Sequence, residues 1–376
     1  MKKILSVFGT RPEVIKMAPV VKALAASSRF ESFICTTSQH RHMQDQMMDL
    51  FDLKADFDFD IMVPGQSISY ITARVLEALD GLLATEKFDA VLVHGDTTTS
   101  FAAALAAFNR GIPVGHVEAG LRTYDLQAPF PEEANRQLTG RLTSMHFAPT
   151  YVAKQNLLKE GTLESTILVT GNTVIDALLY MQEKIESGKI EISIDPQIQA
   201  LVNQNLPFVL ITGHRRESFG QGFLNICEAI RDLSLQFPHW HFVYPVHLNP
   251  NVQEPVQQLL GNLSNVHLME PIGYAPFVYL MSHCYLVLTD SGGVQEEAPS
   301  LGKPVLVMRE VTERPEGIDA GTAMLVGNDR ERIVSGVSRL IEDSNFYHQM
   351  AKAVNPYGDG KAAMRIVDWL RLKQWR

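Results

Sequence analysis

Short apolar runs alternate along the chain with longer segments in which apolar residues recur every three or four positions. Runs such as 4–8 (ILSVF) and 90–95 (AVLVHG) are typical of buried β-strands. Segments such as 70–85 and 98–110 show the period of an α-helix. A repeated order of strand and helix predicts parallel sheets that are covered by helices.

A second series of the same kind begins near residue 207. We therefore expect an α/β protein with two Rossmann-like, doubly wound domains that face each other across a cleft, and the length of 376 residues favours the same division. The first domain is expected at 1–172 and the second at 173–360, with a polar linker zone at 183–199. Open α/β sheets bind ligands beyond the carboxyl ends of their strands, so the cleft is the expected site.

Composition and charge restrict the partners. Hydrophobic residues make up 45% of the chain and charged residues 20%, as in ordinary globular proteins. The formal net charge of −9 argues against a general basic field for nucleic acid, so an anionic ligand needs a local cluster of cations. No apolar run is long enough to span a membrane. We expect neither nucleic acid nor a membrane as a partner.

The sequence lacks the patterns of metal and cofactor sites. The cysteines Cys35, Cys227 and Cys284 stand far apart and are expected to be reduced and buried in a cytoplasmic protein. HxH pairs occur at 40–42 and 239–241, but no matching ligand set accompanies them, so we expect no metal. Neither a GxGxxG fingerprint nor a GxxxxGK(S/T) loop is present after the first predicted strand, and we expect no cofactor.

The turn after the first predicted strand carries more charge than its shape requires. The stretch GTRPEVIK places Arg11, Glu13 and Lys16 where a turn from strand to helix needs only glycine and a cap. The two cations indicate that an anionic group is held there.

Another turn has the features of a phosphate loop. Ser291, Gly292 and Gly293 follow the run YLVLT and are expected to open a helix. Glycines let the backbone come close to a ligand, and N–H groups at a helix start favour phosphate. Glu297, one turn into the helix, can accept two hydrogen bonds from a ribose diol. The alternative is a simple glycine turn with a solvated Glu297.

Carboxylates follow the ends of other predicted strands. Asp96 and Glu118 end successive runs, while Glu132 and Glu133 lie behind two prolines. Each alone is typical of a helix cap or a solvated charge. Gathered in a cleft, however, carboxylates can move protons.

Histidine and arginine occupy comparable positions in the second predicted domain. His214 follows the run FVLIT, with Arg215 and Arg216 beside it. Arg314 lies in a loop after the run PVLVM, where it is either a second anion clamp or a surface arginine.

Ten motifs, in order from about residue 4 to about residue 363, resemble those of the bacterial non-hydrolysing UDP-N-acetylglucosamine 2-epimerases. They include VFGTRPEVIKMAP, VLVHGDTTT, PVGHVEAGLRT, PEEANRQLTG, TGHRRESFG and LTDSGGVQEEAPSLGKPVLVMR. The resemblance implies the two-domain glycosyltransferase-B architecture and a homodimer. It also implies that the tail at 361–376 packs back on the first domain.

The resemblance assigns roles to the residues at matching positions. The catalytic groups that it implies are Asp96, Glu118, Glu132 and His214. The substrate-binding groups that it implies are Arg11 and Lys16 near the diphosphate, the phosphate loop of Ser291, Gly292 and Gly293, the ribose carboxylate Glu297, Arg314 at phosphate or sugar, and Phe277 near the uracil. Some relatives bind a second substrate molecule, to which Gln39, His42 and Arg215 could contribute.

The implied reaction is the reversible interconversion of UDP-N-acetylglucosamine and UDP-N-acetylmannosamine, which supplies bacterial surface polysaccharides. UDP leaves carbon 1 while carbon 2 loses its proton, which produces 2-acetamidoglucal; the proton then returns on the other face and UDP adds back. Two carboxylates on opposite faces of the ring serve as base and acid. Cations and helix-start N–H groups stabilise the charge on the departing diphosphate. The expected ligands are UDP-N-acetylglucosamine and UDP, and the assignment of base and acid stays open.

Three other functions fit parts of the pattern. A glycosyltransferase would use the same phosphate loop but needs an acceptor rather than proton transfer at carbon 2. A hydrolysing epimerase would release N-acetylmannosamine and UDP. A nucleotide-sugar sensor would bind without turnover, but it has no need for facing acids.

Overall fold

The computed structural model describes residues 1–37, 41–61, 63 and 65–373. None of the helices among these residues is long and apolar enough to cross a bilayer.

The chain forms two compact units. Unit 1 consists of Met1–Ala177 and Tyr357–Arg376, and unit 2 of Leu178–Pro356. The division lies inside helix α7 (Thr173–Glu186), a few residues beyond the boundary expected at 172. The expected linker zone is irregular only in its middle, because α7 and α8 (Pro196–Asn203) occupy its two ends.

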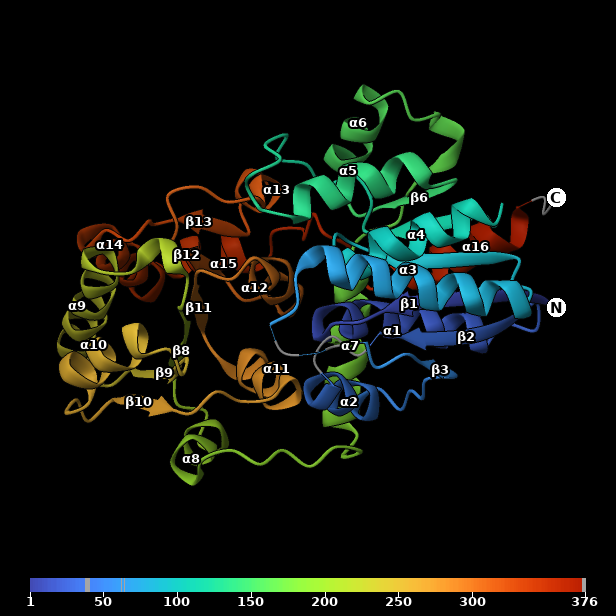
Figure 1. Cartoon of the computed structure of the whole chain (residues 1–376). Coiled ribbons are helices and arrows are strands. Elements are labelled where there is room, and N and C mark those ends of the chain that lie inside the picture. The colour runs from blue at the N-terminus through green and yellow to red at the C-terminus, as the bar shows by residue number, and fades with distance from the viewer. Residues whose placement is uncertain (38–40, 62, 64, 374–376) are drawn as a thin grey trace. The chain divides into compact units, whose positions relative to one another are not determined.

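Unit 1 is built on a seven-stranded parallel sheet of order β3-β2-β1-β4-β5-β6-β7 (Figure 1). The strands are β1 (Lys2–Phe8), β2 (Phe30–Thr36), β3 (Phe57–Asp58), β4 (Ala90–His94), β5 (Val114–Val117), β6 (Met145–Ala148) and β7 (Ile167–Val169). The helices are α1 (Arg11–Ala25), α2 (Arg41–Leu50), α3 (Ile68–Thr85), α4 (Thr98–Asn109), α5 (Glu132–Leu142), α6 (Tyr151–Lys159), the start of α7, and α16 (Ala362–Leu372).

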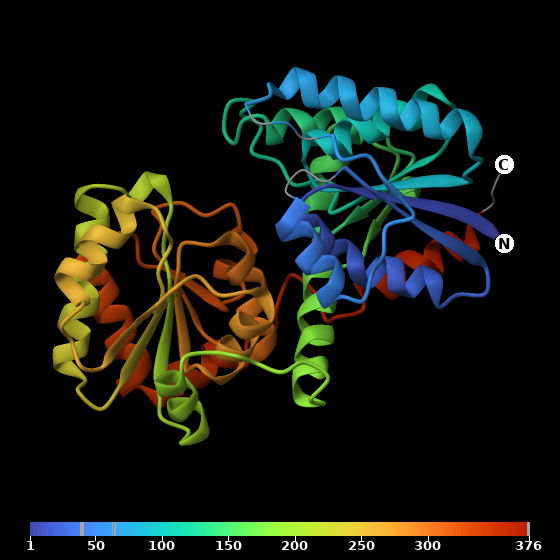
Figure 2. The same cartoon turned by 60° about the horizontal axis from the view of Figure 1, so that its bottom comes forward.

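Unit 2 contains a six-stranded parallel sheet of order β10-β9-β8-β11-β12-β13, with helices on both of its faces (Figure 2). The strands are β8 (Phe208–Thr212), β9 (His241–Pro245), β10 (Val266–Met269), β11 (Leu286–Thr289), β12 (Val305–Val307) and β13 (Ala323–Leu325). The helices are the rest of α7, α8, α9 (Gln221–Gln236), α10 (Pro250–Leu260), α11 (Tyr274–His283), α12 (Gly292–Glu297), α13 (Pro315–Asp319), α14 (Arg330–Glu342) and α15 (Ser344–Ala351).

These two sheets confirm the predicted α/β class with parallel, helix-covered sheets. The strands β3 and β13, which are edge strands of two and three residues, were not predicted. The three cysteines are free and buried, as expected.

Each strand order reverses at one place, between β1 and β4 in unit 1 and between β8 and β11 in unit 2. At such a switch point the connections on either side run in opposite directions, which leaves a crevice beyond the carboxyl ends of the strands. The loops that leave β1, β4, β8 and β11 are therefore the places where a ligand site is expected in each unit.

Alanine brings α4 close to the rest of the core of unit 1. The helix carries five buried alanines, Ala102, Ala103, Ala104, Ala106 and Ala107, which pack with apolar residues of the sheet and of α3. Small side chains allow a close approach, and a close-packed helix holds its first turn in a fixed place. That first turn lies at the switch point.

The C-terminal helix α16 belongs to unit 1 and lies beside α1 (Figure 2). Its first turn is held by Asp176 of α7, whose carboxylate accepts hydrogen bonds from the backbone N–H groups of Ala362 (3.2 Å) and Ala363 (2.9 Å). Further along, Trp369 packs edge-on against Phe147 of β6, with 5.5 Å between the ring centroids.

We predict that Asp176→Ala lowers the free energy of unfolding by about 1–3 kcal/mol, because it leaves buried N–H groups of α16 without an acceptor. Asp368→Ala is the matched control on the same helix, since the ion pair of Asp368 with Arg371 is exposed and such pairs contribute less than about 1 kcal/mol. Urea unfolding followed by circular dichroism measures both. Equal effects of the two substitutions would show that Asp176 does not anchor α16.

Candidate functional site

A buried carboxylate organises the switch point of unit 1. Glu13, in the first turn of α1, is 2% exposed. Its Oε2 accepts hydrogen bonds from the backbone N–H groups of Gly9 (3.0 Å) and Thr10 (2.8 Å) and from the Thr10 hydroxyl (2.8 Å). Its Oε1 accepts from Thr97 (2.7 Å) and Ser100 (3.0 Å), at the start of α4. Glu13 therefore ties the loop after β1 to the loop after β4, and its charge is not offered to a ligand.

Glu118 follows β5 and lies in an unusual backbone conformation. Its φ of 62° is in the left-handed region, which residues other than glycine seldom adopt and which is found preferentially at functional sites. Its Oε2 forms an ion pair with Lys16 of α1 and accepts a hydrogen bond from the side chain of Asn172 (2.8 Å). Both side chains of the ion pair are largely buried. Lys16, expected at a diphosphate, is thus also the counter-ion of an expected catalytic acid.

Two buried histidines lie on the neighbouring strands β4 and β5, and one of them, His94, lies near this ion pair. His94 ends β4, and its Nε2 is 3.8 Å from Oε2 of Glu118. Burial lowers the pKa of His94 from its ordinary value of 6.5 to about 4, although the Glu118 carboxylate opposes the shift. His116 of β5 makes a 2.7 Å hydrogen bond through Nε2 to the carbonyl of Gly95, and burial lowers its pKa to about 3. Both imidazoles are therefore neutral at neutral pH.

Asp96 lies between β4 and α4, but it does not cap that helix. The N-cap is Thr97, whose side chain accepts a hydrogen bond from the N–H of Ser100. The carboxylate of Asp96 binds Arg136 instead, with two guanidinium nitrogens 2.9 and 2.7 Å from Oδ2. A quarter of the Asp96 side chain stays exposed, so the acid is held in place while remaining open to a ligand.

The two glutamates behind the prolines differ in role. Glu133 is fully buried, and it accepts hydrogen bonds from the backbone N–H groups of Thr123 (3.1 Å) and Tyr124 (3.2 Å). It therefore anchors the preceding loop. Glu132 is the first residue of α5 and is only partly buried, which leaves this acid available for chemistry.

Arg11 is the first residue of α1 and is partly buried, directly after the N-cap Thr10. With Glu118, Asp96 and Lys16 it lies on segments that follow three neighbouring strands, β1, β4 and β5. Their carboxyl ends share one edge of the sheet. The expected residues of unit 1 thus follow the carboxyl ends of neighbouring strands, near the point where the strand order reverses.

In unit 2 the predicted phosphate loop follows β11. Ser291 is the N-cap of α12, and Gly292 and Gly293 form its first turn. The guanidinium of Arg314 lies beside Gly292, so a Cβ placed there would be 3.7 Å from Cζ of the arginine. Nε of Arg314 donates to Glu296 at 2.6 Å, and both side chains are largely buried. Arg314 is therefore a fixed cation next to the helix start at Gly292.

Glu297 is not a solvated charge. It is 6% exposed and accepts a 2.8 Å hydrogen bond from the hydroxyl of Tyr274. Tyr274 opens α11, and Phe277 follows it by three residues on a neighbouring part of the same helix. A carboxylate oriented by a tyrosine can accept the hydroxyl donors of a diol.

His214 and Arg215 follow β8, and both are fixed through their backbone. Their N–H groups donate to Oδ2 of Asp290 at 2.7 Å each. Asp290 directly follows β11, so this carboxylate joins the two loops of the switch point in unit 2. The His214 ring is 4.9 Å from the ring of His247 and stacks on it at 12°.

The remaining expected residues concern a second substrate molecule. Gln39 lies outside the described residues. His42 falls within α2, but its side chain lies outside them as well. Of the three, only Arg215 can be placed.

Sequence reasoning missed several residues that orient the expected ones. They are Asn172 at Glu118, Arg136 at Asp96, Tyr274 at Glu297 and Asp290 at His214. Glu13, by contrast, stood out in the sequence, and Thr10 and Glu13 have the spacing of a capping box. The others lie far along the chain from, or carry no motif that links them to, the residues that they bind.

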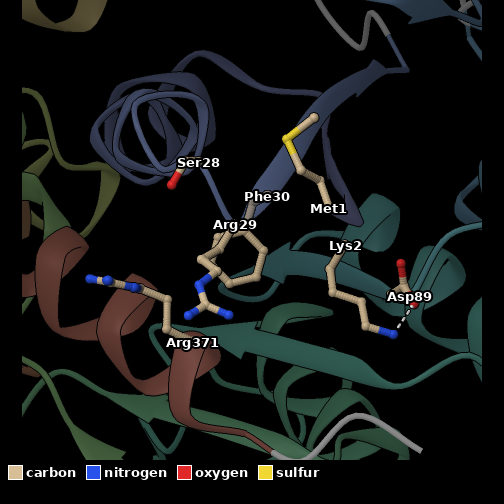
Figure 3. A pocket seen from close by; sticks show the side chains of 7 residues that line it. All are labelled: Met1, Lys2, Ser28, Arg29, Phe30, Asp89 and Arg371. Atoms are coloured by element: carbon tan, nitrogen blue, oxygen red, sulfur yellow. Dashed lines mark hydrogen bonds and ion pairs between the residues drawn. The ribbon is translucent and has the colours of Figure 1, made fainter.

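A pocket of about 380 Å³ lies at the other edge of the unit 1 sheet, where β1 begins (Figure 3). It is lined by Met1, Lys2, Ser28, Arg29, Phe30, Asp89 and Arg371. Asp89 binds Lys2 at 2.8 Å. None of the expected site residues lines this pocket, so we place the candidate site at the carboxyl edges. Among the described residues, no three histidine, cysteine or acidic side chains are grouped as a metal ion requires.

The chain is similar to known proteins over almost its whole length. Residues 22–371 match the family model described as UDP-N-acetylglucosamine 2-epimerase. The UDP-N-acetylglucosamine 2-epimerase of Yersinia pestis is 56% identical over 372 residues, which cover 99% of both chains.

Two solved structures show the same fold. One is the UDP-GlcNAc 2-epimerase of Neisseria meningitidis bound to UDP-GlcNAc, with a TM-score of 0.87 and 51% identity over 99% of this chain and 100% of that one. The other is the UDP-GlcNAc 2-epimerase of Methanocaldococcus jannaschii in complex with UDP-GlcNAc and UDP, with a TM-score of 0.79 and 34% identity over the same shares.

The neutral buried histidines predict a sensitivity to acid. Because the folded-state pKa of His116 is lowered from 6.5 to about 3, the unfolded chain binds a proton below pH 6.5 that the folded chain does not. Stability therefore falls as the pH drops below 6.5, and His116→Asn should reduce that slope by about 1 kcal/mol per pH unit. Urea unfolding at several pH values between 7 and 5 measures it. His239→Asn, at an exposed histidine, is the control that should keep the wild-type slope; an unchanged slope in His116→Asn would refute the prediction.

Proposed function

The chain belongs to the UDP-N-acetylglucosamine 2-epimerase family, and we propose that it catalyses the reversible interconversion of UDP-N-acetylglucosamine and UDP-N-acetylmannosamine. It is accordingly an isomerase. The observation that carries the proposal is the full-length similarity to enzymes of that name together with acids at adjacent strand ends. The product sugar nucleotide would supply bacterial surface polysaccharides.

The proposed route avoids a direct removal of the proton at carbon 2. This proton is not next to a carbonyl group, so a simple carbanion would be too unstable. Departure of UDP from carbon 1 draws electrons toward the anomeric centre, and the loss of the proton then forms 2-acetamidoglucal. Adding a proton on the opposite face and UDP at carbon 1 gives the epimer. No electron acceptor is consumed, because the overall reaction is an isomerisation.

Unit 1 contributes the proton transfers in this proposal. Asp96 and Glu118 act at or near carbon 2, and Glu132 supports or supplies the returning proton. The contacts described above suit these roles, because Arg136 and Lys16 fix two of the acids and a quarter of the Asp96 side chain stays exposed. A base that is held by a counter-ion is kept in a fixed orientation toward the proton that it removes.

Unit 2 contributes the groups that hold the nucleotide. Helix-start N–H groups at Ser291, Gly292 and Gly293, with Arg314, would stabilise the charge that grows on the departing diphosphate. Glu297 would accept the ribose hydroxyls, and Phe277 would contact the uracil. His214 and Arg11 would complete the diphosphate contacts.

A glycosyltransferase would use the same nucleotide groups. It has no use for the acids at the strand ends, and especially not for Glu118, which has a left-handed backbone conformation and an ion-paired carboxylate. A nucleotide-sugar sensor, which binds without turnover, has no use for these acids either. These observations favour an epimerase. The expected homodimer and the cytoplasmic location stay predictions.

Proton NMR of the purified protein with UDP-N-acetylglucosamine in deuterated water tests the proposal. We expect UDP-N-acetylmannosamine to form without an acceptor, with deuterium at carbon 2 of the sugar. In Asp96→Asn, Glu118→Gln and Glu132→Gln the exchange should slow by roughly 100-fold or more where the residue transfers the proton.

Glu164→Gln is the matched control, since Glu164 is a largely exposed carboxylate of unit 1 that pairs with Lys154. It should keep the wild-type rate. Undiminished exchange in one of the three variants removes that residue from proton transfer. Interconversion without deuterium in the product would exclude the whole elimination route.

We further propose that Arg215 helps to bind a second molecule of UDP-N-acetylglucosamine that activates turnover. Arg215 is partly buried, and its backbone is fixed by Asp290. Initial rates should then depend sigmoidally on substrate in the wild type and hyperbolically in Arg215→Met, with Arg231→Met on α9 as the control. Hyperbolic kinetics of the wild type in both directions would contradict this role.

A further inference from the structure

Asp290 has a buried carboxylate, and only one of its two oxygens accepts hydrogen bonds from the described residues. It is 1% exposed and lies directly after the central strand β11. Oδ2 accepts hydrogen bonds from the backbone N–H groups of His214 and Arg215, at 2.7 Å each. Oδ1 is also buried, yet it has no hydrogen-bond partner among the described residues. A buried carboxylate oxygen without a hydrogen-bond donor is unfavourable. We therefore expect Oδ1 to gain a donor when the protein binds its ligand.

The side chain of His214 is a basic group close to this oxygen. Its Nδ1 is 3.9 Å from Oδ1, which is too long for a hydrogen bond but within reach of a small rotation of the ring. Almost half of the His214 side chain is exposed, so the ring has room to move. Distances of this kind in ligand-free sites often shorten when the ligand binds.

The other groups that face His214 limit how its ring can be charged. His247 stacks on it at 4.9 Å, and Nδ1 of His247 accepts a hydrogen bond from the N–H of Asn249 (3.1 Å). Burial lowers the pKa of His214, His247 and Arg215 lower it further, and only Asp290 raises it. In the absence of an anion the imidazole is therefore predominantly neutral at neutral pH, and a second anion beside the ring would favour its protonated form.

We propose that Asp290 is a positioning residue that receives the Nδ1–H of His214 and so presents Nε2 of that histidine to the nucleotide diphosphate. This inference rests on the proposed function. The bond to Oδ1 fixes one tautomer, with the proton on Nδ1 and a lone pair on Nε2. When a diphosphate binds, Nε2 takes one proton from solvent, and the resulting imidazolium lies between two anions.

The proton balance follows from the elimination. As the bond between carbon 1 and the phosphate oxygen breaks, the electron pair stays on the diphosphate, and the Nε2–H of the imidazolium donates to that oxygen. When UDP adds back, the same proton stays with Nε2. Asp290 holds the ring and stabilises its positive charge, as a carboxylate does in other aspartate–histidine pairs.

Asp290→Asn gives a sharp test, because the amide should reverse the tautomer. The amide oxygen must accept the hydrogen bonds from the N–H groups of His214 and Arg215. The NH2 group of the asparagine then points toward Nδ1 of His214. That nitrogen must then accept, and the proton moves to Nε2. Long-range nitrogen–proton NMR of 15N-labelled full-length protein reports which ring nitrogen carries the proton, and His214→Gln identifies the signal.

We expect Nδ1–H in the wild type and Nε2–H in Asp290→Asn. With UDP bound, the pKa of His214 should be lower in the variant by roughly 1 unit or more. The turnover number should fall at least about tenfold with a smaller change in KM. Asp319→Asn, at an exposed aspartate of the same unit, should resemble the wild type in each measurement.

A double-mutant cycle separates positioning from folding. If Asp290 acts through His214, Asp290→Asn should cost little further activity in a His214→Gln background. A full additional loss there, or an unchanged tautomer and pKa in Asp290→Asn, would overturn the inference. The NMR measurement needs no turnover, so it tests Asp290 even if the wild type fails to form UDP-N-acetylmannosamine, an outcome that would count against the proposed function alone.

Discussion

In each unit, one buried carboxylate locks together the two loops that leave the central strands. Glu13 does so between β1 and β4, and Asp290 between β8 and β11. Both accept hydrogen bonds from two consecutive backbone N–H groups, which lie in the loop after β1 in unit 1 and in the loop after β8 in unit 2. A parallel sheet brings strand ends to one edge, but it does not by itself fix the loops beyond them. The buried carboxylates supply that constraint, because each joins one loop to the other through several hydrogen bonds.

The charges near the proposed chemistry follow a consistent rule. The acids keep counter-ions, as Glu118 does with Lys16 and Asp96 with Arg136, while the imidazoles of His94 and His116 are kept neutral by burial. An acid that must accept a proton benefits from being ionised in its resting state. A neutral His94 beside Glu118 does not compete with Lys16 for the carboxylate. The arrangement therefore holds reactive carboxylates in a partly buried site without leaving an unpaired charge there.

Much of this could be predicted from the pattern of the chain. Glycines and charged residues after apolar runs located the loops at β4, β5, β8 and β11, because strand ends carry no apolar period and their polar residues stand out. The structural partners could not be predicted in the same way. Asn172 lies 54 residues from Glu118 and Tyr274 lies 23 residues from Glu297, and each has an ordinary sequence context. Burial turned Glu133 and Asp290 into anchors, and burial depends on packing between segments that the local sequence does not specify.

The reversibility of the proposed reaction gives a reason for the moderated charge around the phosphate loop. UDP must leave carbon 1 and later attack it again, so a site that bound the free diphosphate far more tightly than the sugar nucleotide would stop at the intermediate. Arg314 is the cation beside Gly292, but Glu296 already lies 2.6 Å from its Nε. In the proposed site, the other groups of unit 2 at the diphosphate are neutral N–H groups and His214, which we propose to be protonated only when the diphosphate is bound. These groups bind the diphosphate more strongly as negative charge grows on it. They bind it less strongly once the bond to carbon 1 has formed again.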